Sequence, residues 1–277
     1  MSTNYEPPIT NIRLGLSSYT YGWAVGLPGH APACPLDESG LLDKCREHGI
    51  QLLQVGDNLP LHTFDAPRLE RFAQRAREEG VQLEIGARRL TLERIGDYAA
   101  IARRVGATLI RFVIDDADYY PEPATATAVL RKAAPLLDGL TLGIENHDRF
   151  RAATLRSIID AAGADRIGVC LDTANSLGAG EGLDTVLATL GPLTVNLHIK
   201  DFHIARVQHL MGFTVEGRPA GQGFLDVPLL KQLGAFPRCQ TAVLELWTPP
   251  EPLLEETIAK EAAWAAQSLA FLKPLFR

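Results

Sequence analysis

The sequence predicts an α/β protein built as a single (β/α)8 TIM barrel that comprises residues 1–277. The prediction depends on eight short apolar runs that alternate along the chain with eight segments of helical periodicity. Several helical segments end on a glycine directly before the next apolar run, as at Gly49, Gly80 and Gly106, and glycine is a common helix stop signal. No linker or low-complexity tract divides the chain, so we expect one domain.

The expected elements follow one another in strand-helix order. The strands are expected at 12–18, 50–56, 81–86, 108–114, 140–145, 167–172, 195–198 and 242–245, and the helices at 36–48, 66–79, 92–105, 123–137, 152–162, 182–190, 227–233 and 255–272. An open doubly wound sheet is the main alternative. It is disfavoured because an aromatic stretch, 17–23, follows the first strand in place of a glycine-rich nucleotide loop. The stretch 201–226 is expected to be a long irregular loop on the catalytic face.

Composition limits the class of partner. The net charge of −6 argues against nucleic acid, because its phosphates require a basic surface. The first residues have no signal-peptide pattern, and no apolar run is long enough to span a bilayer, so we expect a cytoplasmic protein without membrane contact. The four cysteines lack the spacing of a disulfide framework or a zinc site and are interpreted as reduced thiols.

Four candidate metal ligands end the last four expected strands: Glu145, Asp172, His198 and Glu245. Side chains alternate across a strand, and in each run the candidate ligand lies opposite the strand's apolar face. Catalytic residues of a barrel lie at these carboxyl ends of the strands. Three carboxylates brought together without a cation would repel one another, so we expect a divalent ion. Oxygen ligands with one imidazole favour Mn²⁺, with Mg²⁺, Co²⁺ and Zn²⁺ as alternatives.

Five motifs resemble the sugar phosphate isomerase/epimerase group of xylose isomerase-like barrels: 143–146 (GIEN), 170–173 (CLDT), 196–201 (NLHIKD), 221–226 (GQGFLD) and 244–245 (LE). This family includes ketose 3-epimerases, inosose dehydratases, hydroxypyruvate isomerases and 3-oxo-isoapionate decarboxylases. The resemblance implies that the same four residues bind the metal and that Glu145 and Glu245 exchange protons with the substrate. It also implies self-association into a dimer or tetramer. Epimerases commonly have a histidine where this chain has Asn175, which weakens an ordinary epimerase assignment.

Further polar and aromatic residues are candidates for binding the substrate. The cations Lys200, Arg111 and Arg206 would suit a carboxylate or phosphate, and Asn175 can hydrogen-bond a substrate oxygen. Tyr19, Trp23 and Trp247 lie just beyond the first and eighth strands, where aromatic rings could form the wall of a sugar pocket. Two alternatives stay open: Arg111 could pair internally with Glu84 or Gln54, and Tyr19 or Trp23 could cap the barrel or enter an interface.

The function expected from these residues is that of a metal-dependent isomerase or epimerase in carbohydrate metabolism. A bound metal would acidify the carbon between a hydroxyl and a carbonyl group and stabilise the enediolate of a small keto sugar. The first alternative is a lyase that uses the same site to decarboxylate a 3-keto sugar acid, such as 3-oxo-isoapionate, or to dehydrate a keto-polyol. A non-catalytic sugar-binding barrel is the alternative from another class. No phosphate-binding glycine loop follows the last strands, which favours an unphosphorylated substrate.

Overall fold

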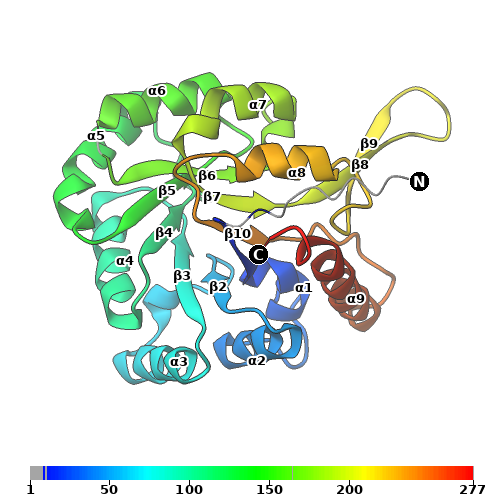
Figure 1. Cartoon of the computed structure of the whole chain (residues 1–277), viewed down its shortest axis with the longest axis horizontal. Coiled ribbons are helices and arrows are strands. Elements are labelled where there is room, and N and C mark those ends of the chain that lie inside the picture. Colours follow the sequence, from blue (N-terminus) through cyan, green and yellow to red (C-terminus); the bar gives the residue numbers. More distant parts are fainter. Residues whose placement is uncertain (1–8, 10, 164, 277) are drawn as a thin grey trace.

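Eight parallel strands close into a barrel in the computed structural model, which describes residues 9, 11–163 and 165–276 (Figure 1). The strands follow the order β1-β10-β7-β6-β5-β4-β3-β2 around the barrel, and every neighbouring pair is parallel. The predicted fold class is therefore confirmed. The barrel strands are β1 (Arg13–Ser17), β2 (Leu52–Val55), β3 (Gln82–Ala87), β4 (Leu109–Phe112), β5 (Thr141–Glu145), β6 (Ile167–Asp172), β7 (Thr194–Ile199) and β10 (Thr241–Leu244).

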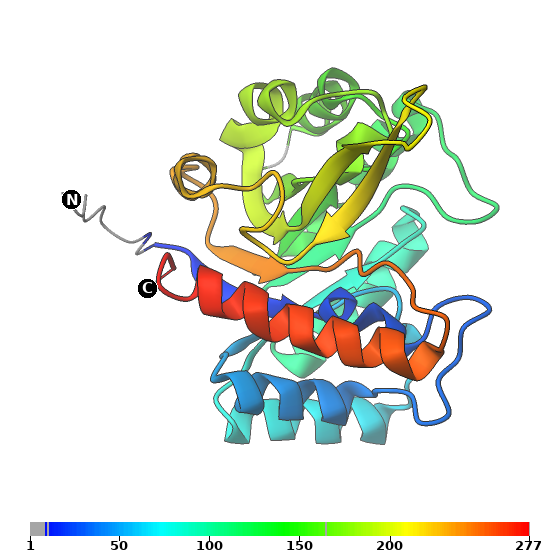
Figure 2. The ribbon, with the colours of Figure 1, turned by 90° about the vertical axis from the view of Figure 1, so that its right-hand side faces the viewer.

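Helices surround the barrel and connect its strands (Figures 1 and 2). Four of them begin where the sequence offers a capping side chain: Asp37, Asp65, Thr91 and Asp226 each accept a backbone N–H of the first turn. The helices are α1 (Gly22–Val25), α2 (Glu38–His48), α3 (Ala66–Glu78), α4 (Leu92–Val105), α5 (Pro123–Ala133), α6 (Ala152–Ala162), α7 (Leu183–Leu190), α8 (Val227–Gly234) and α9 (Leu254–Leu272). Short 3₁₀ helices occupy Ser18–Tyr21, Leu61–Thr63, Ala134–Leu137, Asn175–Leu177 and Gly191–Leu193.

The barrel interior contains a polar layer as well as apolar side chains. The outward faces of the strands pack against the helices. For example, the buried rings of Tyr98 on α4 and Phe112 on β4 have their centroids 6.0 Å apart. Inside, Gln54, Glu84 and Asn196 are almost completely buried. Buried polar groups require hydrogen-bond partners. The hydrogen bonds of this polar layer therefore constrain the side chains that contact it at the carboxyl ends of the strands.

The stretch 201–226 was expected to be irregular, and this expectation is wrong for the two segments that form strands. Residues Asp201–Arg206 (β8) and Phe213–Arg218 (β9) form an antiparallel hairpin that projects beyond β7 (Figure 1). The Asp201 carboxylate fixes the return to the barrel, because it accepts backbone N–H groups from Phe202, Gly221, Gly223, Phe224 and Leu225. The glycine-containing motif after the hairpin thus has a structural explanation.

No helix in the described part of the chain has both the length and the apolar character that a bilayer crossing requires. The proposal that residues 1–277 form one domain remains a prediction, since some of these residues lie outside the described ranges.

Candidate metal centre and active site

The four predicted metal ligands lie together at the carboxyl ends of the strands. Glu145 and Asp172 are the last residues of β5 and β6, His198 lies near the end of β7, and Glu245 directly follows β10. The Nδ1 atom of His198 is 3.2 Å from Glu245 Oε1, 3.8 Å from Glu145 Oε1 and 4.0 Å from Asp172 Oδ2. All four side chains are buried. Strand parity and strand-end position therefore selected four residues that the fold brings together.

The arrangement fits a divalent ion. The buried His198 Nδ1 has no hydrogen-bond partner, and the buried Asp172 Oδ2 has none besides its ion pair with Lys200. Ligand atoms of Asp172, His198 and Glu245 lie within 4.8 Å of one another, and the same holds for Glu145, Cys170 and His198. Burial raises the pKa of the Cys170 thiol well above its usual value, so the thiol is neutral and a poor ligand. The carboxylates and the imidazole remain as the ligand set.

Two buried cations neutralise these carboxylates. The Lys200 ammonium lies 2.8 Å from Asp172 Oδ2 and 3.0 Å from Glu245 Oε2. Burial alone would lower the pKa of Lys200, but the attraction of Asp172 and Glu245 outweighs it and raises the pKa. Burial likewise favours a high pKa for Glu245, but His198 and Lys200 hold the pKa of this carboxyl well below its usual range. Lys200 is therefore protonated and Glu245 ionised.

Arg111 has different partners from those considered from the sequence. Its guanidinium forms ion pairs with Glu145 and Asp57. The alternative of an internal pair with Glu84 or Gln54 is wrong, because both of those side chains bond to other groups of the polar layer. Arg111 thus supports the candidate ligand Glu145 from the side of the barrel that carries β2, β3 and β4.

Asn175 lines the space beside the cluster and connects several of its side chains. Its Nδ2 donates to Glu145 Oε1 at 2.7 Å, and its Oδ1 accepts from Lys200 Nζ at 3.3 Å. Its backbone N–H donates to Asp172 Oδ1 at 2.8 Å. Asn175 therefore contacts two of the candidate ligands and Lys200, while its side chain offers no group that could carry a proton at ordinary pH.

The sequence interpretation missed two residues of the site. Ser17 donates its hydroxyl hydrogen to Glu245 Oε1 at 2.9 Å, and Asp57 pairs with Arg111 and accepts from Tyr19 Oη at 2.9 Å. Ser17 ends β1, and Asp57 follows β2 by two residues. The strand-end argument that located the ligands would have found both residues if it had been applied to the first two strands.

A chamber of about 180 Å³ lies directly over the cluster, and it includes most of the predicted substrate-binding residues. Trp247 is 39% exposed, and its ring lies 5.1 Å from Lys200 Nζ. The chamber is lined by Tyr19, Arg88, Arg111, Glu145, His147, Asn175, Lys200, Glu245, Leu246 and Trp247.

Two predicted substrate contacts lie elsewhere. Trp23 lines a neighbouring cavity of about 480 Å³ and donates its indole N–H to Thr248 O at 2.9 Å. Arg206 ends β8 and is exposed; it donates to Leu210 O at 2.7 Å and lies 4.6 Å from the Phe213 ring centroid. Arg206 lies away from the chamber because β8 is a strand of the hairpin, and the hairpin carries Arg206 away from the barrel. The irregular loop that was expected could have folded back over the barrel.

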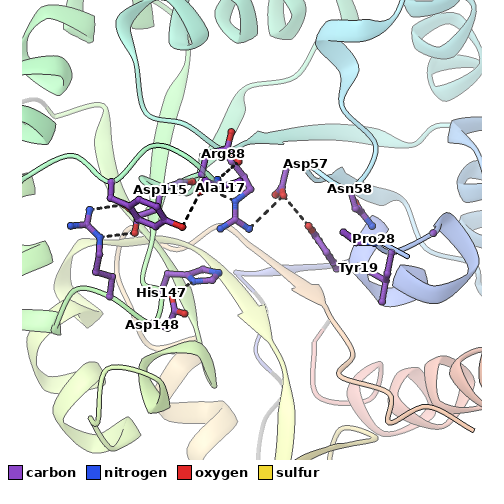
Figure 3. A pocket seen from close by; sticks show the side chains of 14 residues that line it. Tyr19, Pro28, Asp57, Asn58, Arg88, Asp115, Ala117, His147 and Asp148 are labelled. Atoms are coloured by element: carbon purple, nitrogen blue, oxygen red, sulfur yellow. Dashed lines mark hydrogen bonds and ion pairs between the residues drawn. The ribbon is translucent and has the colours of Figure 1, made fainter. Parts of the chain in front are cut away.

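A larger cavity of about 980 Å³ adjoins the chamber and shares Tyr19, Arg88 and His147 with it (Figure 3). The Arg88 guanidinium lies between the two spaces. It has only long contacts there, 3.7 Å from Asp57 Oδ2 and 3.4 Å from Asp115 O. The stronger bonds of Asp57 and Asp115 go to Arg111 and Arg149. Arg88 therefore has donors to offer a molecule that enters the chamber.

Comparisons with known proteins agree with this geometry. The sequence profile of the xylose isomerase-like TIM barrel matches residues 42–275. The chain belongs to this family. A relative from Pectobacterium atrosepticum, a 3-oxo-isoapionate decarboxylase, is 32% identical over 262 residues, which cover 94% of each chain.

Solved structures with the same fold are more distant in sequence. An L-ribulose 3-epimerase is 18% identical with a TM-score of 0.67, covering 95% of this chain and 93% of that one. A Mycobacterium smegmatis barrel in complex with magnesium is 15% identical with a TM-score of 0.66, covering 98% and 100%. The zinc-bound IOLI protein is 15% identical with a TM-score of 0.64, covering 94% and 99%. Members of this fold thus bind divalent metals, and the chain's relatives include sugar-processing enzymes.

Proposed function

We propose that this protein is a divalent-metal-dependent lyase that decarboxylates a small keto sugar acid. The observation that carries the proposal is the charge of the chamber. Apart from the exposed Asp148, which pairs with His147, the charged side chains in and against it are four carboxylates and three cations, namely Asp57, Glu145, Asp172 and Glu245 with Arg88, Arg111 and Lys200. An imidazole that binds a metal is neutral, so these side chains then leave one net negative charge, and the bound divalent ion would convert it into one net positive charge. Such a chamber favours a monoanion.

The residues present suit the loss of a carboxyl group. In a β-keto acid the carbon-carbon bond to the carboxyl group breaks, and its electron pair moves toward the ketone and forms an enolate. A divalent ion held by Glu145, Asp172, His198 and Glu245 supplies Lewis-acid stabilisation for that charge when it is bound. The carbon that has lost the carboxyl group then has to gain one proton, and no base is needed to remove a proton from it. Lys200 is the protonated group at the chamber wall, so we assign it the delivery of that proton.

The relative from Pectobacterium supports this assignment, because it matches the chain over nearly its full length and is a decarboxylase. Mn²⁺ is the metal that we propose, since oxygen-rich sites with a single imidazole suit it. Zn²⁺ and Mg²⁺ are the alternatives, since the IOLI protein binds zinc and the Mycobacterium smegmatis barrel is in complex with magnesium.

Isomerisation or epimerisation is the second candidate, and one observation favours it. Glu245 and Glu145 approach His198 from opposite sides of β7, because β10 neighbours β7 on one side and β6 and β5 follow on the other. Two carboxylates in such positions can act as general base and general acid on adjacent carbons. Asn175 weakens this candidate, because an amide cannot carry a proton between them.

One experiment separates the two reactions and also tests for a binding protein without activity. The purified protein is incubated with Mn²⁺ in deuterated water, once with 3-oxo sugar acids and once with neutral ketoses. Carbon dioxide release in proportion to acid consumed, with one deuterium on the product carbon, is the result that we expect. Deuterium incorporation into ketoses without carbon dioxide would favour the isomerase. No metal binding and no turnover on either class would leave a sugar-binding barrel.

A further inference from the structure

A chain of buried polar side chains crosses the barrel interior beneath the metal centre. It consists of Gln54 on β2, Glu84 on β3 and Asn196 on β7, whose exposed fractions are at most 1%. Glu84 also lines a cavity at the opposite end of the barrel, beside residues that begin strands, such as Thr141 and Thr241. The chain therefore connects the bottom of the barrel to the site at its top, and the reaction proposed above does not use Glu84.

The hydrogen bonds of Gln54 fix the orientation of its amide. Its Nε2 donates to Glu84 Oε2 at 2.9 Å and to Asn196 Oδ1 at 3.2 Å, so both amide hydrogens are used. Its Oε1 lies 2.6 Å from His198 Nε2. The reversed amide would face its carbonyl oxygen toward the Glu84 carboxylate and lose these bonds. An acceptor at Glu84 thus keeps the Gln54 carbonyl directed at His198.

Asn196 is oriented by bonds of its own. Its Nδ2 donates to Thr241 Oγ1 at 2.8 Å, and its Oδ1 accepts from Cys170 Sγ at 3.0 Å as well as from Gln54. The amide oxygen therefore has to face Gln54. Asn196 Nδ2 also donates to Glu84 Oε2 at 3.3 Å, so this second acceptor is itself held partly by Glu84 and supports the same orientation of the Gln54 amide.

The orientation of Gln54 determines the tautomer of His198. A carbonyl oxygen can only accept, so His198 Nε2 carries the hydrogen and the neutral ring has its lone pair on Nδ1. Nδ1 is the atom that lies 3.2 Å from Glu245 Oε1 and has no hydrogen-bond partner. The other tautomer would place an N–H where a cation has to bind. Outer-shell partners of this kind preorganise metal-binding histidines.

We infer that Glu84 is a positioning residue that acts through Gln54 to hold His198 in its Nε2–H tautomer, with Nδ1 free to bind a divalent cation. The inference rests on the metal-dependent function proposed above, but it concerns the imidazole itself and can be tested without turnover. Gln54 is the direct link and Glu84 the residue that orients it.

The tautomer is measured by long-range ¹H–¹⁵N correlation on protein labelled with ¹⁵N-histidine. Spectra are recorded without metal at alkaline pH, where the ring is neutral, and with diamagnetic Zn²⁺ bound; the His198 signals are assigned by their loss in His198→Asn. We expect the Nε2–H pattern in both states, with Zn²⁺ shifting Nδ1. An Nδ1–H pattern in the metal-free protein, or Zn²⁺ on Nε2, would overturn the inference without any further variant.

Variants then test each link. In Gln54→Met we expect mixed tautomers and a divalent affinity that calorimetry shows to be about 10- to 100-fold weaker. Glu84→Met should give a smaller change in the same direction, and the double variant should be no worse than Gln54→Met, because Glu84 acts only through Gln54. Additive losses, or an unchanged His198 spectrum in Gln54→Met, would contradict the proposal.

Thr194→Val is the matched control. Thr194 is fully buried on the same strand as His198, but its hydroxyl donates to Leu190 O at 3.2 Å and stands outside the chain of polar residues. It should lose thermal stability and keep both the His198 tautomer and the metal affinity. If the protein fails to decarboxylate any acid but the spectra behave as described, the proposed reaction fails and this inference stands.

Discussion

The Lys200 ammonium lies 2.8 Å from the Asp172 carboxylate that is expected to bind the metal, and a cation entering the site must compete with it. We therefore predict opposite effects of Lys200→Met on binding and on turnover. The affinity for Mn²⁺ should rise by about tenfold, or ~1.4 kcal/mol, because the competing charge is removed. Turnover should fall by at least ~10²-fold, because the proton donor is lost. Calorimetry and a carbon dioxide assay measure the two quantities.

Lys260→Met provides the control for that experiment. Both ammonium groups lie over a tryptophan ring, with Lys200 Nζ 5.1 Å from Trp247 and Lys260 Nζ 5.3 Å from Trp264. Lys260 pairs with Glu251 outside the chamber, so its loss should change neither quantity. Weaker Mn²⁺ binding in Lys200→Met would mean that Lys200 supports the ion and does not compete with it.

Glu145→Gln and Glu245→Gln should each lower turnover by at least ~10²-fold and weaken divalent binding, because an amide is a poorer metal ligand than a carboxylate. Both side chains lie against His198 Nδ1. The exposed Glu256→Gln is the control for the chemical change. Circular dichroism and thermal unfolding would verify the fold. Near-normal activity of either variant would remove that residue from the metal centre and from proton transfer.

The candidate ligands could be predicted from the sequence because two local rules place them. Parity assigns a face to each side chain of a strand, and the closed parallel barrel brings all carboxyl strand ends to one rim. Glu145, Asp172, His198 and Glu245 follow both rules. Helix boundaries could also be predicted from the sequence. The helix Leu92–Val105, for example, has a capping threonine before it and a glycine in the left-handed conformation after it.

Contacts between segments that are far apart in the sequence could not be predicted in this way. The Arg111 pair with Asp57 joins residues 54 positions apart, and nothing in the periodicity of either strand selects one carboxylate over another. The hairpin was missed because exposed residues such as His203 and Glu216 dilute the apolar signal in both of its strands. The position of the hairpin decides whether Arg206 reaches the substrate. The prediction that Arg206 binds the substrate therefore depended on tertiary structure that the sequence pattern does not show.

Arg111→Met should destabilise the fold by about 3 to 5 kcal/mol, because it leaves the buried carboxylates of Asp57 and Glu145 without their shared cation. Urea unfolding measures the loss. The double variant with Asp57→Asn should recover part of it, since one of the two uncompensated charges is removed. Arg156→Met is the control: its pair with Asp160 is exposed, and its loss should cost less than about 1 kcal/mol. An equally small cost for Arg111→Met would contradict the prediction.

Glu261 should make stability depend on pH. Burial raises the pKa of this carboxyl to about 7, against the smaller opposing effect of N–H groups that include those of Trp23 and Ala24. The folded state therefore retains a proton that the unfolded state loses near 4.5. The contribution of Glu261 to stability should be greatest below pH 4.5 and decline by about 3 kcal/mol as the pH rises to 7.

The variant Glu261→Gln isolates that contribution. The difference in unfolding free energy between wild type and variant should change across pH 4.5 to 7 and stay constant above this range, because the group is ionised in both states there. Glu255→Gln, an exposed position on the same helix, should show no such difference. If the unfolding free energies of wild type and Glu261→Gln differ by the same amount at every pH, Glu261 is ionised in the folded protein throughout this pH range.

The base of the hairpin is built against Trp247, and Gly217 makes this contact feasible. A Cβ atom at Gly217 would lie 1.9 Å from Trp247 O and 2.6 Å from Trp247 Cβ, so Gly217→Ala has to displace either β9 or the residue that walls the chamber. We expect greater acrylamide quenching of tryptophan fluorescence and a kcat/KM at least about tenfold lower, since small misplacements of positioning groups are costly. Gly182→Ala is the control, because nothing lies within 4 Å of its Cβ position and its φ of −76° suits alanine. Unchanged quenching and kcat/KM in Gly217→Ala would show that neither the hairpin nor Trp247 positions the substrate.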